Sequence, residues 1–238
     1  VIFLSGVNQN HSGLEVEADM QVIDMLRLNA SVGIGNWKFE GDATGKYQAN
    51  EYDDAGNVTG LTQTTYEYAL DKLFVGDMPQ TGMALGATVT PIDGLSVQAL
   101  FNYYDKNYSD WSPSSRQIND FGDDGIEGDG VDTPYDNGEG DGLLSELELT
   151  YADREQVWMA PSYSKLDVHI KYDLPVGIAG TRMQAFAHIF NALDAVYVQD
   201  AVDHSQYNSY GDKVHAAHNA EVFLGTPRYF NMGLKVNF

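Results

Sequence analysis

Apolar residues recur at every second position in several stretches of this chain. In the clearest stretch, Leu26, Leu28, Ala30, Val32 and Ile34 alternate with polar or glycine residues. Successive side chains of a β-strand point to opposite faces, so this pattern predicts a strand with one apolar face and one polar face. The same alternation predicts seven strands, at residues 13–20, 26–37, 81–90, 95–108, 163–174, 182–191 and 226–238.

The last of these stretches stays apolar at every second position up to the final residue. The alternating residues are Phe230, Met232, Leu234, Val236 and Phe238. A barrel in an outer membrane needs a last strand that pairs with another strand, and aromatic side chains anchor such strands at the bilayer interface. We therefore predict that these five residues form a membrane-insertion signal.

The predicted connections fall into two classes that alternate along the chain. Residues 21–25, 90–94 and 175–180 are tight turns, whereas 39–65, 109–161 and 192–221 are long loops. Short periplasmic turns and long extracellular loops alternate in this way in outer-membrane barrels. A soluble β-sandwich also has alternating strands, but it has no reason to place every long loop at one end. The pattern favours an all-β fold, a transmembrane antiparallel β-barrel.

The number of strands indicates a part of a larger barrel. Bacterial single-chain barrels generally have an even number of strands and both termini in the periplasm. Seven strands that end in the periplasm would place residue 1 outside the cell, and the sequence shows no initiator Met and no signal peptide. We expect this chain to be the C-terminal portion of a barrel whose earlier strands are not in this sequence.

Charge is distributed unevenly along the chain. The formal net charge is −22, and 24 of the 35 acidic residues lie in the three long loops. Such a surface would repel phosphates, so nucleic acid is excluded as a partner. The chain has no cysteine, which excludes disulfides and thiolate metal sites, and it has no apolar run of about 18 residues that would predict a transmembrane helix.

Several short motifs resemble those of TonB-dependent outer-membrane receptors. They are GVNQNHSGLEVE at residues 6–17, GDMPQT at 76–81, PSYSKLD at 161–167 and FAHIFNALDAVY at 186–197, followed by the terminal Gly, Pro, Arg and Phe positions of 225–238. None of these motifs is decisive alone, but they occur in the order of the family and cover most of the chain outside the long loops.

This resemblance implies a fold, a location and a function. The family has a barrel of roughly 22 strands closed by an N-terminal plug domain. It takes up a scarce nutrient, such as a siderophore, a metal chelate, cobalamin or a glycan, with energy from the TonB complex of the inner membrane. The implied partners are the plug and N-terminal barrel strands, the TonB complex that acts on the plug, and the lipids of the cell outer membrane. The plug is not in this sequence.

Two other functions are compatible with a barrel of this kind. One is a scaffold that anchors surface lipoproteins, and the other is an outer-membrane hydrolase. The sequence-local acid–histidine pairs are Asp203 with His204 and Asp212 with His215, but no nucleophile motif, zinc motif or phosphate-binding loop is present. We therefore expect no enzymatic activity.

Two groups of residues are candidate metal ligands, although the implied function requires no cofactor. Residues 120–142 hold nine acids, seven glycines and no Lys or Arg, a composition that suits Ca²⁺. The candidate ligands are Asp123, Asp124, Glu127, Asp129, Asp132 and Asp136. The alternative is a solvated loop held open by its own charge, since the EF-hand spacing is absent.

The second group is His204, His215 and His218, which all lie in the last long loop. His215 and His218 could share a transition metal on one helical turn, or all three could be isolated surface histidines. Aromatic residues such as Trp37 lie near the outer strand ends, where they favour an interfacial girdle over a substrate platform. His169 and His188 are expected on the polar face of their strands.

Overall fold

The computed structural model describes residues 2–118, 152–175, 181–205 and 214–237. These residues form an almost wholly β structure, with one helical turn, α1 (Pro113–Arg116). Every strand pair in the described residues is antiparallel. The prediction of an all-β antiparallel fold is therefore confirmed.

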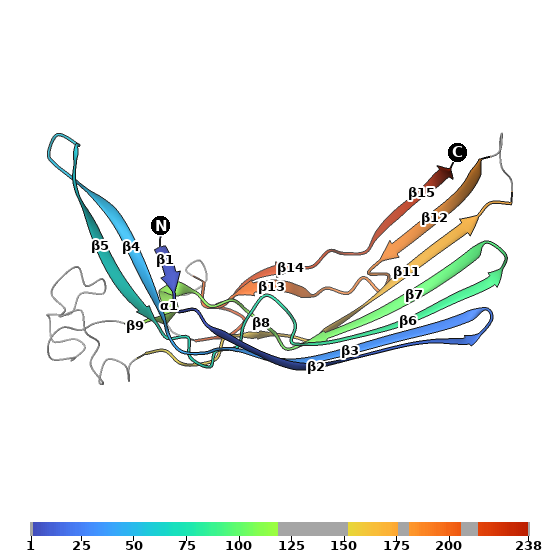
Figure 1. The fold of residues 1–238 in the computed structure, drawn as a ribbon, viewed down its shortest axis with the longest axis horizontal. Coiled ribbons are helices and arrows are strands. Elements are labelled where there is room, and N and C mark those ends of the chain that lie inside the picture. The colour runs from blue at the N-terminus through green and yellow to red at the C-terminus, as the bar shows by residue number, and fades with distance from the viewer. Residues whose placement is uncertain (1, 119–151, 176–180, 206–213, 238) are drawn as a thin grey trace.

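The largest sheet has seven strands in the order β15-β12-β11-β7-β6-β3-β2, so neighbours along the chain are neighbours in the sheet (Figure 1). Its strands are β2 (Gln9–Ile23), β3 (Leu26–Phe39), β6 (Thr81–Ile92), β7 (Leu95–Asp105), β11 (Tyr163–Asp173), β12 (Arg182–Phe190) and β15 (Tyr229–Asn237). These are the seven predicted strands. Within the described residues they form an open, curved sheet with β2 and β15 at its edges, and no closed barrel is formed.

Two turns of this sheet lie together at one end. The β2–β3 and β6–β7 turns are both short, and Figure 1 shows them side by side at the right of the view. Gly94 has a φ of 79° in the β6–β7 turn, a conformation that side chains with a Cβ rarely adopt. A Cβ at Gly94 would also lie 2.8 Å from the carbonyl oxygen of Asp173, so this turn needs glycine for two reasons.

The predicted strand bounds and loops need several corrections. The strand predicted at 13–20 is longer, since β2 runs from Gln9 to Ile23, and the strand predicted at 226–238 begins only at Tyr229. The strand predicted at 95–108 ends at Asp105, because Lys106 has a φ of 54° and breaks the extended chain. After this break, β8 (Asn107–Tyr108) pairs with β10 (Met159–Ala160) instead. The long connections are also not structureless: the region 39–65 contains most of a hairpin formed by β4 (Ala43–Tyr52) and β5 (Val58–Tyr68).

The remaining strands lie beyond the end of the large sheet that is opposite the short turns, with β13 and β14 near the middle of the molecule in Figure 1. β1 (Ile2–Ser5), β4, β5 and β9 (Gln117–Ile118) form one small sheet, and β13 (Val198–Val202) pairs with β14 (Glu221–Leu224). The buried hydrophobic cluster lies here and consists of Phe39, Ala43, Tyr68, Leu70, Leu73 and Val157. The core of the described chain is therefore at the base of the β4–β5 hairpin, and the seven-stranded sheet has no second layer packed on it.

Among the described residues, no helix has the length and apolar character needed to cross a membrane.

Candidate functional surfaces of the sheet

One face of the seven-stranded sheet is apolar across its whole width. Residues that lie directly opposite each other in the register share a face. One continuous row consists of Met20, Leu28, Ala87, Ala99, Val168, Ile189 and Phe230. The next row consists of Leu26, Val89, Val97, Ile170, Ala187 and Met232. Both rows contain only apolar side chains.

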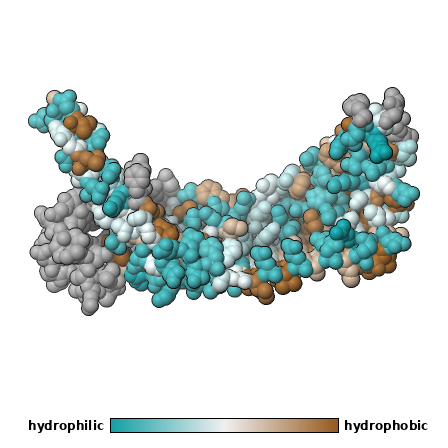
Figure 2. Space-filling model, in the orientation of Figure 1, coloured by the Kyte–Doolittle hydropathy of each residue, from teal (hydrophilic) through white to brown (hydrophobic). Residues whose placement is uncertain are grey.

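This apolar face is open to its surroundings. Met20 is 57% exposed, Phe230 62% and Met232 73%. Figure 2 shows hydrophobic side chains along the lower margin of the sheet, where β2 and β3 run. A soluble monomer rarely exposes so large a continuous apolar surface, and such a surface marks contact with a membrane or another protein.

The opposite face is polar. Its central row consists of Gln21, Arg27, Thr88, Gln98, His169, His188 and Asn231. Side chains on this face bond to one another: Nη2 of Arg27 lies 2.9 Å from Oδ1 of Asp19, and the Nδ1 atoms of His169 and His188 lie 2.8 Å apart. The register thus gathers most polar side chains on this face, although Leu100, Phe186 and Phe190 also lie there as exceptions to the alternation.

The predicted insertion signal falls on the apolar face as far as the structure describes it. Phe230, Met232, Leu234 and Val236 all lie in β15, and their partners in β12 are Ile189, Ala187, Ala185 and Met183. Phe238 lies outside the described residues. The outer side of β15 has no neighbour in the described chain.

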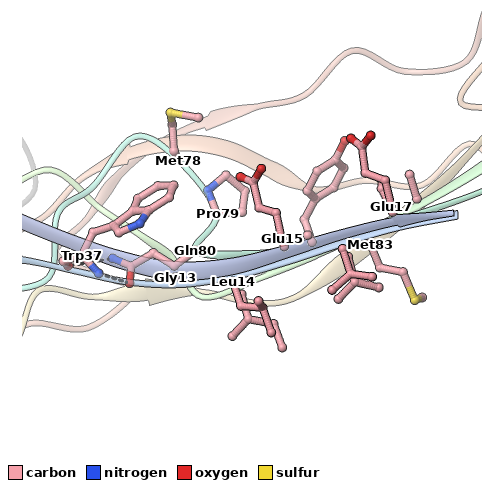
Figure 3. A pocket seen from close by; sticks show the side chains of 18 of the residues that line it. Gly13, Leu14, Glu15, Glu17, Trp37, Met78, Pro79, Gln80 and Met83 are labelled. Atoms are coloured by element: carbon pink, nitrogen blue, oxygen red, sulfur yellow. Dashed lines mark hydrogen bonds between the residues drawn. The ribbon is translucent and has the colours of Figure 1, made fainter.

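A hollow of about 570 Å³ lies on the polar face, towards the end of the sheet that carries the long connections. Its floor is the backbone of β2, β3 and β6 at glycine positions: Gly13, Gly33, Gly35 and Gly82. Figure 3 shows Glu15, Glu17, Trp37, Met78 and Pro79 on the side of the hollow, whereas Leu14 and Met83 point to the other side of the sheet. Tyr104, His11 and Asn102 complete the walls.

Trp37 is held in place by a buried glutamine. The side-chain oxygen Oε1 of Gln80 accepts the backbone N–H of Trp37 at 2.9 Å, and Nε2 of Gln80 donates to the backbone oxygens of Trp37 at 2.9 Å and Val75 at 3.2 Å. The indole lies over Gly35, where a Cβ would come within 2.8 Å of its Nε1. Its ring also stacks on His11, with centroids 5.2 Å apart. Trp37 therefore lies on the polar face. A residue of an interfacial girdle would lie on the apolar face, so the register does not agree with that prediction.

A buried ionic network ties together the connections at the same end of the molecule. The Arg116 guanidinium is fully buried; its Nη1 lies 3.2 Å from Oδ1 of Asp153 and its Nη2 lies 3.4 Å from Oδ2 of Asp203. His215 bridges the same two carboxylates, with Nε2 at 2.8 Å from Oδ2 of Asp153 and Nδ1 bonded to Oδ2 of Asp203. Two cations and two anions thus neutralise one another.

Burial and hydrogen bonding act in opposite directions on this network. Burial alone would lower the pKa of His215, but its bonds to Asp153 and Asp203 outweigh burial and raise the pKa to about 9. Burial alone would raise the pKa of Asp153, but the bond from His215 and the charge of Arg116 lower it. The network is therefore an imidazolium and a guanidinium between two carboxylates at neutral pH.

The predicted histidine group is only partly brought together. The rings of His204 and His215 are 5.8 Å apart, but both nitrogens of His215 are bonded to carboxylates, and His218 is exposed. In the described parts of the chain, no group of three or more His, Cys, Asp or Glu side chains could hold a metal ion. The predicted calcium ligands at residues 123–136 lie outside the described residues.

The sequence analysis did not find which residues bond to Asp203 and His215. Asp203 was paired with His204 by proximity in the chain, whereas the structure bonds Asp203 to His215 and Arg116. It also missed the raised pKa of Asp110, to about 6, which follows from burial and from the nearby charges of Asp77 and Asp200. No local pattern reveals these groups, because they come from separate segments.

No family model, curated protein or solved structure matches this chain.

Proposed function

We propose that this chain is part of the wall of an outer-membrane β-barrel, and that the barrel is a TonB-dependent receptor that takes up a scarce nutrient. The observation that carries the membrane part is the open apolar face that runs unbroken across all seven strands. Lipid would cover this face, while the polar face would line the interior of the barrel.

Strand length and edges support the same proposal. The strands of the sheet have between 9 and 15 residues, and a tilted strand needs about 9–11 residues to cross the hydrocarbon core. The free edges of β2 and β15 expose unpaired N–H and C=O groups, which would be costly in lipid. Further strands that pair with both edges and close the barrel would satisfy these groups.

The transport function rests on the family resemblance of the motifs, and two of these motifs have a local role in the structure. The motif at residues 76–81 contains Gln80, which fixes Trp37 on the polar face. The motif at 6–17 runs into β2 and supplies Glu15 and Glu17 to the same hollow. Both motifs thus shape the interior wall that a transported molecule would pass.

The membrane orientation can be tested with single cysteines, because the chain has none of its own. Two matched pairs are Val168→Cys with Asp167→Cys, and Leu28→Cys with Arg27→Cys, since the members of each pair lie on opposite faces. After the full-length protein is folded into lipid vesicles, a nitroxide on residue 168 or 28 should be relaxed by oxygen dissolved in the bilayer. One on residue 167 or 27 should be relaxed by a water-soluble nickel complex. Equal exposure of both members to the nickel complex would refute the membrane-facing assignment.

The transport part needs a separate experiment. Cells that produce the full-length protein, with and without a functional TonB complex, would be compared for uptake of ferric siderophores, cobalamin and oligosaccharides. Uptake that requires both the protein and TonB supports the proposal. A correctly inserted barrel that gives no TonB-dependent uptake of any of these would favour the scaffold function.

A further inference from the structure

The hollow on the polar face has walls of two chemical kinds. Trp37 and Tyr104 supply aromatic rings, and Glu15 and Glu17 supply two carboxylates from the same face of β2. Residues two apart on a strand lie roughly 6.5–7 Å apart on one face, so both carboxylates can reach a single small molecule.

The two carboxylates have no counter-charge. In the described residues, the side chains of Glu15 and Glu17 form neither a hydrogen bond nor an ion pair. Their neighbours across the register are Gly33 and Ser31 in β3, followed by Gly82 and Ala84 in β6, and none of these is basic. The row of Glu17 continues through Asn102 in β7 to Lys165 in β11, which is four strands away from β2. Arg27 lies two rows further along the sheet and is already bonded to Asp19.

The hollow is also formed before any ligand arrives. Gln80 fixes the backbone of Trp37, and His11 stacks on the indole ring. The glycine floor leaves space: a Cβ at Gly33 would meet only Cγ of Glu15, at 3.8 Å, and one at Gly82 would meet only ring atoms of Tyr104, at 3.8 Å or more. A rigid aromatic wall and a shaped floor reduce the entropy cost of binding.

We propose that this hollow binds an organic cation, a molecule in which an ammonium group is joined to a flat or apolar part. The ammonium group would be attracted to the carboxylates of Glu15 and Glu17, while the apolar part would lie against the ring of Trp37 or Tyr104. The flat part would cover the glycine floor. This inference goes beyond the proposed function, because binding needs only the hollow and not energised uptake.

The test compares two probes of similar shape and opposite charge on the full-length protein in detergent micelles. Benzyltrimethylammonium and phenylacetate would each be titrated by calorimetry. The cation should bind, and its affinity should fall as NaCl is raised, because salt screens charge attraction. Phenylacetate should give no binding heat. Equal binding of the two probes, or no binding of the cation, would overturn the proposal.

Variants locate the site. Glu15→Gln and Glu17→Gln keep the shape of the side chain and should each weaken binding of the cation by about three- to fivefold. Trp37→Leu should weaken it by about two- to fivefold through loss of the ring face. Asp93→Asn, an exposed carboxylate change in the β6–β7 turn, is the matched control and should leave affinity unchanged.

One further variant fills the hollow. Gly33→Leu should abolish binding, since its side chain would extend into the space above the floor. If this variant does not fold, as judged by heat-modifiability on a gel, the two isosteric glutamine variants still decide the question. Wild-type affinity in both glutamine variants would show that the carboxylates do not hold the cation, and the proposal would be wrong.

Discussion

The buried network of Arg116, Asp153, Asp203 and His215 should make the connections that it joins sensitive to alkaline pH. The His215 side chain is only 3% exposed, and its pKa is raised from 6.5 to about 9 by the two carboxylates that outweigh the effect of burial. A group whose pKa is higher in the folded state contributes stability that is fully present below its unfolded pKa. The contribution of His215 is therefore complete below pH 6.5 and is lost as the pH rises through 9.

The size of this contribution follows from the shift. Each pKa unit corresponds to 1.36 kcal/mol, so the shift amounts to roughly 3 kcal/mol of local stability. In a His215→Gln variant this contribution is absent at every pH. The stability gap between wild type and variant should thus be roughly 3 kcal/mol near pH 6 and should shrink to a small remainder near pH 10.

Hydrogen exchange measures this gap where the network lies. The backbone N–H of Trp158 donates to Oδ1 of Asp203 at 3.2 Å, so a peptide that covers residues 153–160 reports on opening of the network. Wild type and variant would be compared at the same pH, which cancels the intrinsic pH dependence of exchange. Burial and the charges of Asp77 and Asp200 raise the pKa of Asp110 to about 6, so its contribution to stability is lost as the pH rises from 3.8 through 6. Wild type and variant share this contribution, so it does not affect the difference between them.

The control for this experiment is His218→Gln, because His218 is exposed and lies in the same connection. This variant should match wild type throughout the pH range. A gap between wild type and His215→Gln that stays constant from pH 6 to pH 10 would refute the reasoning. It would mean that His215 stabilises the connections by shape and hydrogen bonding and not by its charge.

Three further outcomes are expected from the sheet. Val168→Arg should cost about 2–4 kcal/mol of folding free energy in lipid vesicles, measured by denaturant titration, because it would place a charge on the apolar face; a neutral effect would contradict the facing of Val168. Gly35→Ala should lower the melting temperature and displace the Trp37 fluorescence, while Gly33→Ala should change neither, since only the Cβ at Gly35 meets the indole, at 2.8 Å. Gln80→Leu should cost about 1–3 kcal/mol, seen in the same titration, because the part-buried N–H of Trp37 loses its acceptor and the Trp37 oxygen keeps only the N–H of Val75.

The seven strands of the large sheet could be predicted because their signal is local. An amphipathic strand carries its two faces in its own sequence, so Leu28 and Arg27 report their opposite sides without knowledge of their neighbours. The apolar residues of this strand, from Leu26 to Ile34, are even-numbered, whereas Arg27 and Trp37 are odd-numbered. Trp37 therefore lies on the same polar face as Arg27. The prediction of Trp37 as part of an interfacial girdle did not take this alternation into account. The sequence alone was enough to assign Trp37 to the polar face.

The β4–β5 hairpin was missed because neither of its faces is apolar. Its strands are rich in Thr, Gln and Tyr, and their few aliphatic residues do not recur at every second position, so a search for apolar alternation finds no strand. Its turn did carry a signal: Asp53 accepts the N–H groups of Ala55 and Asn57, and Gly56 has a φ of 81°. An Asp–Asp–Ala–Gly–Asn segment between β-forming residues indicates a hairpin turn.

The ionic network could not be predicted from the sequence. Arg116 and His215 are 99 residues apart, and the two carboxylates lie between them in the chain. Two of these charges lie in the connection 109–161 and two in 192–221, and they meet only when the strands before and after both connections are placed. The sequence gives the types of these residues but not their neighbours.

The apolar residues at the two ends of the molecule lie in different surroundings. At the end with the long connections, Phe39, Tyr68 and Leu73 are buried against one another, as in a water-soluble domain. Along the seven strands, apolar side chains such as Met20 and Phe230 have no protein layer over them. Hydrophobic burial can stabilise the sheet only if something outside the described chain covers that face. A bilayer supplies an apolar surrounding, and it also makes each ladder hydrogen bond of the sheet costly to break. The proposed membrane location thus accounts for both the uncovered face and the absence of a second layer.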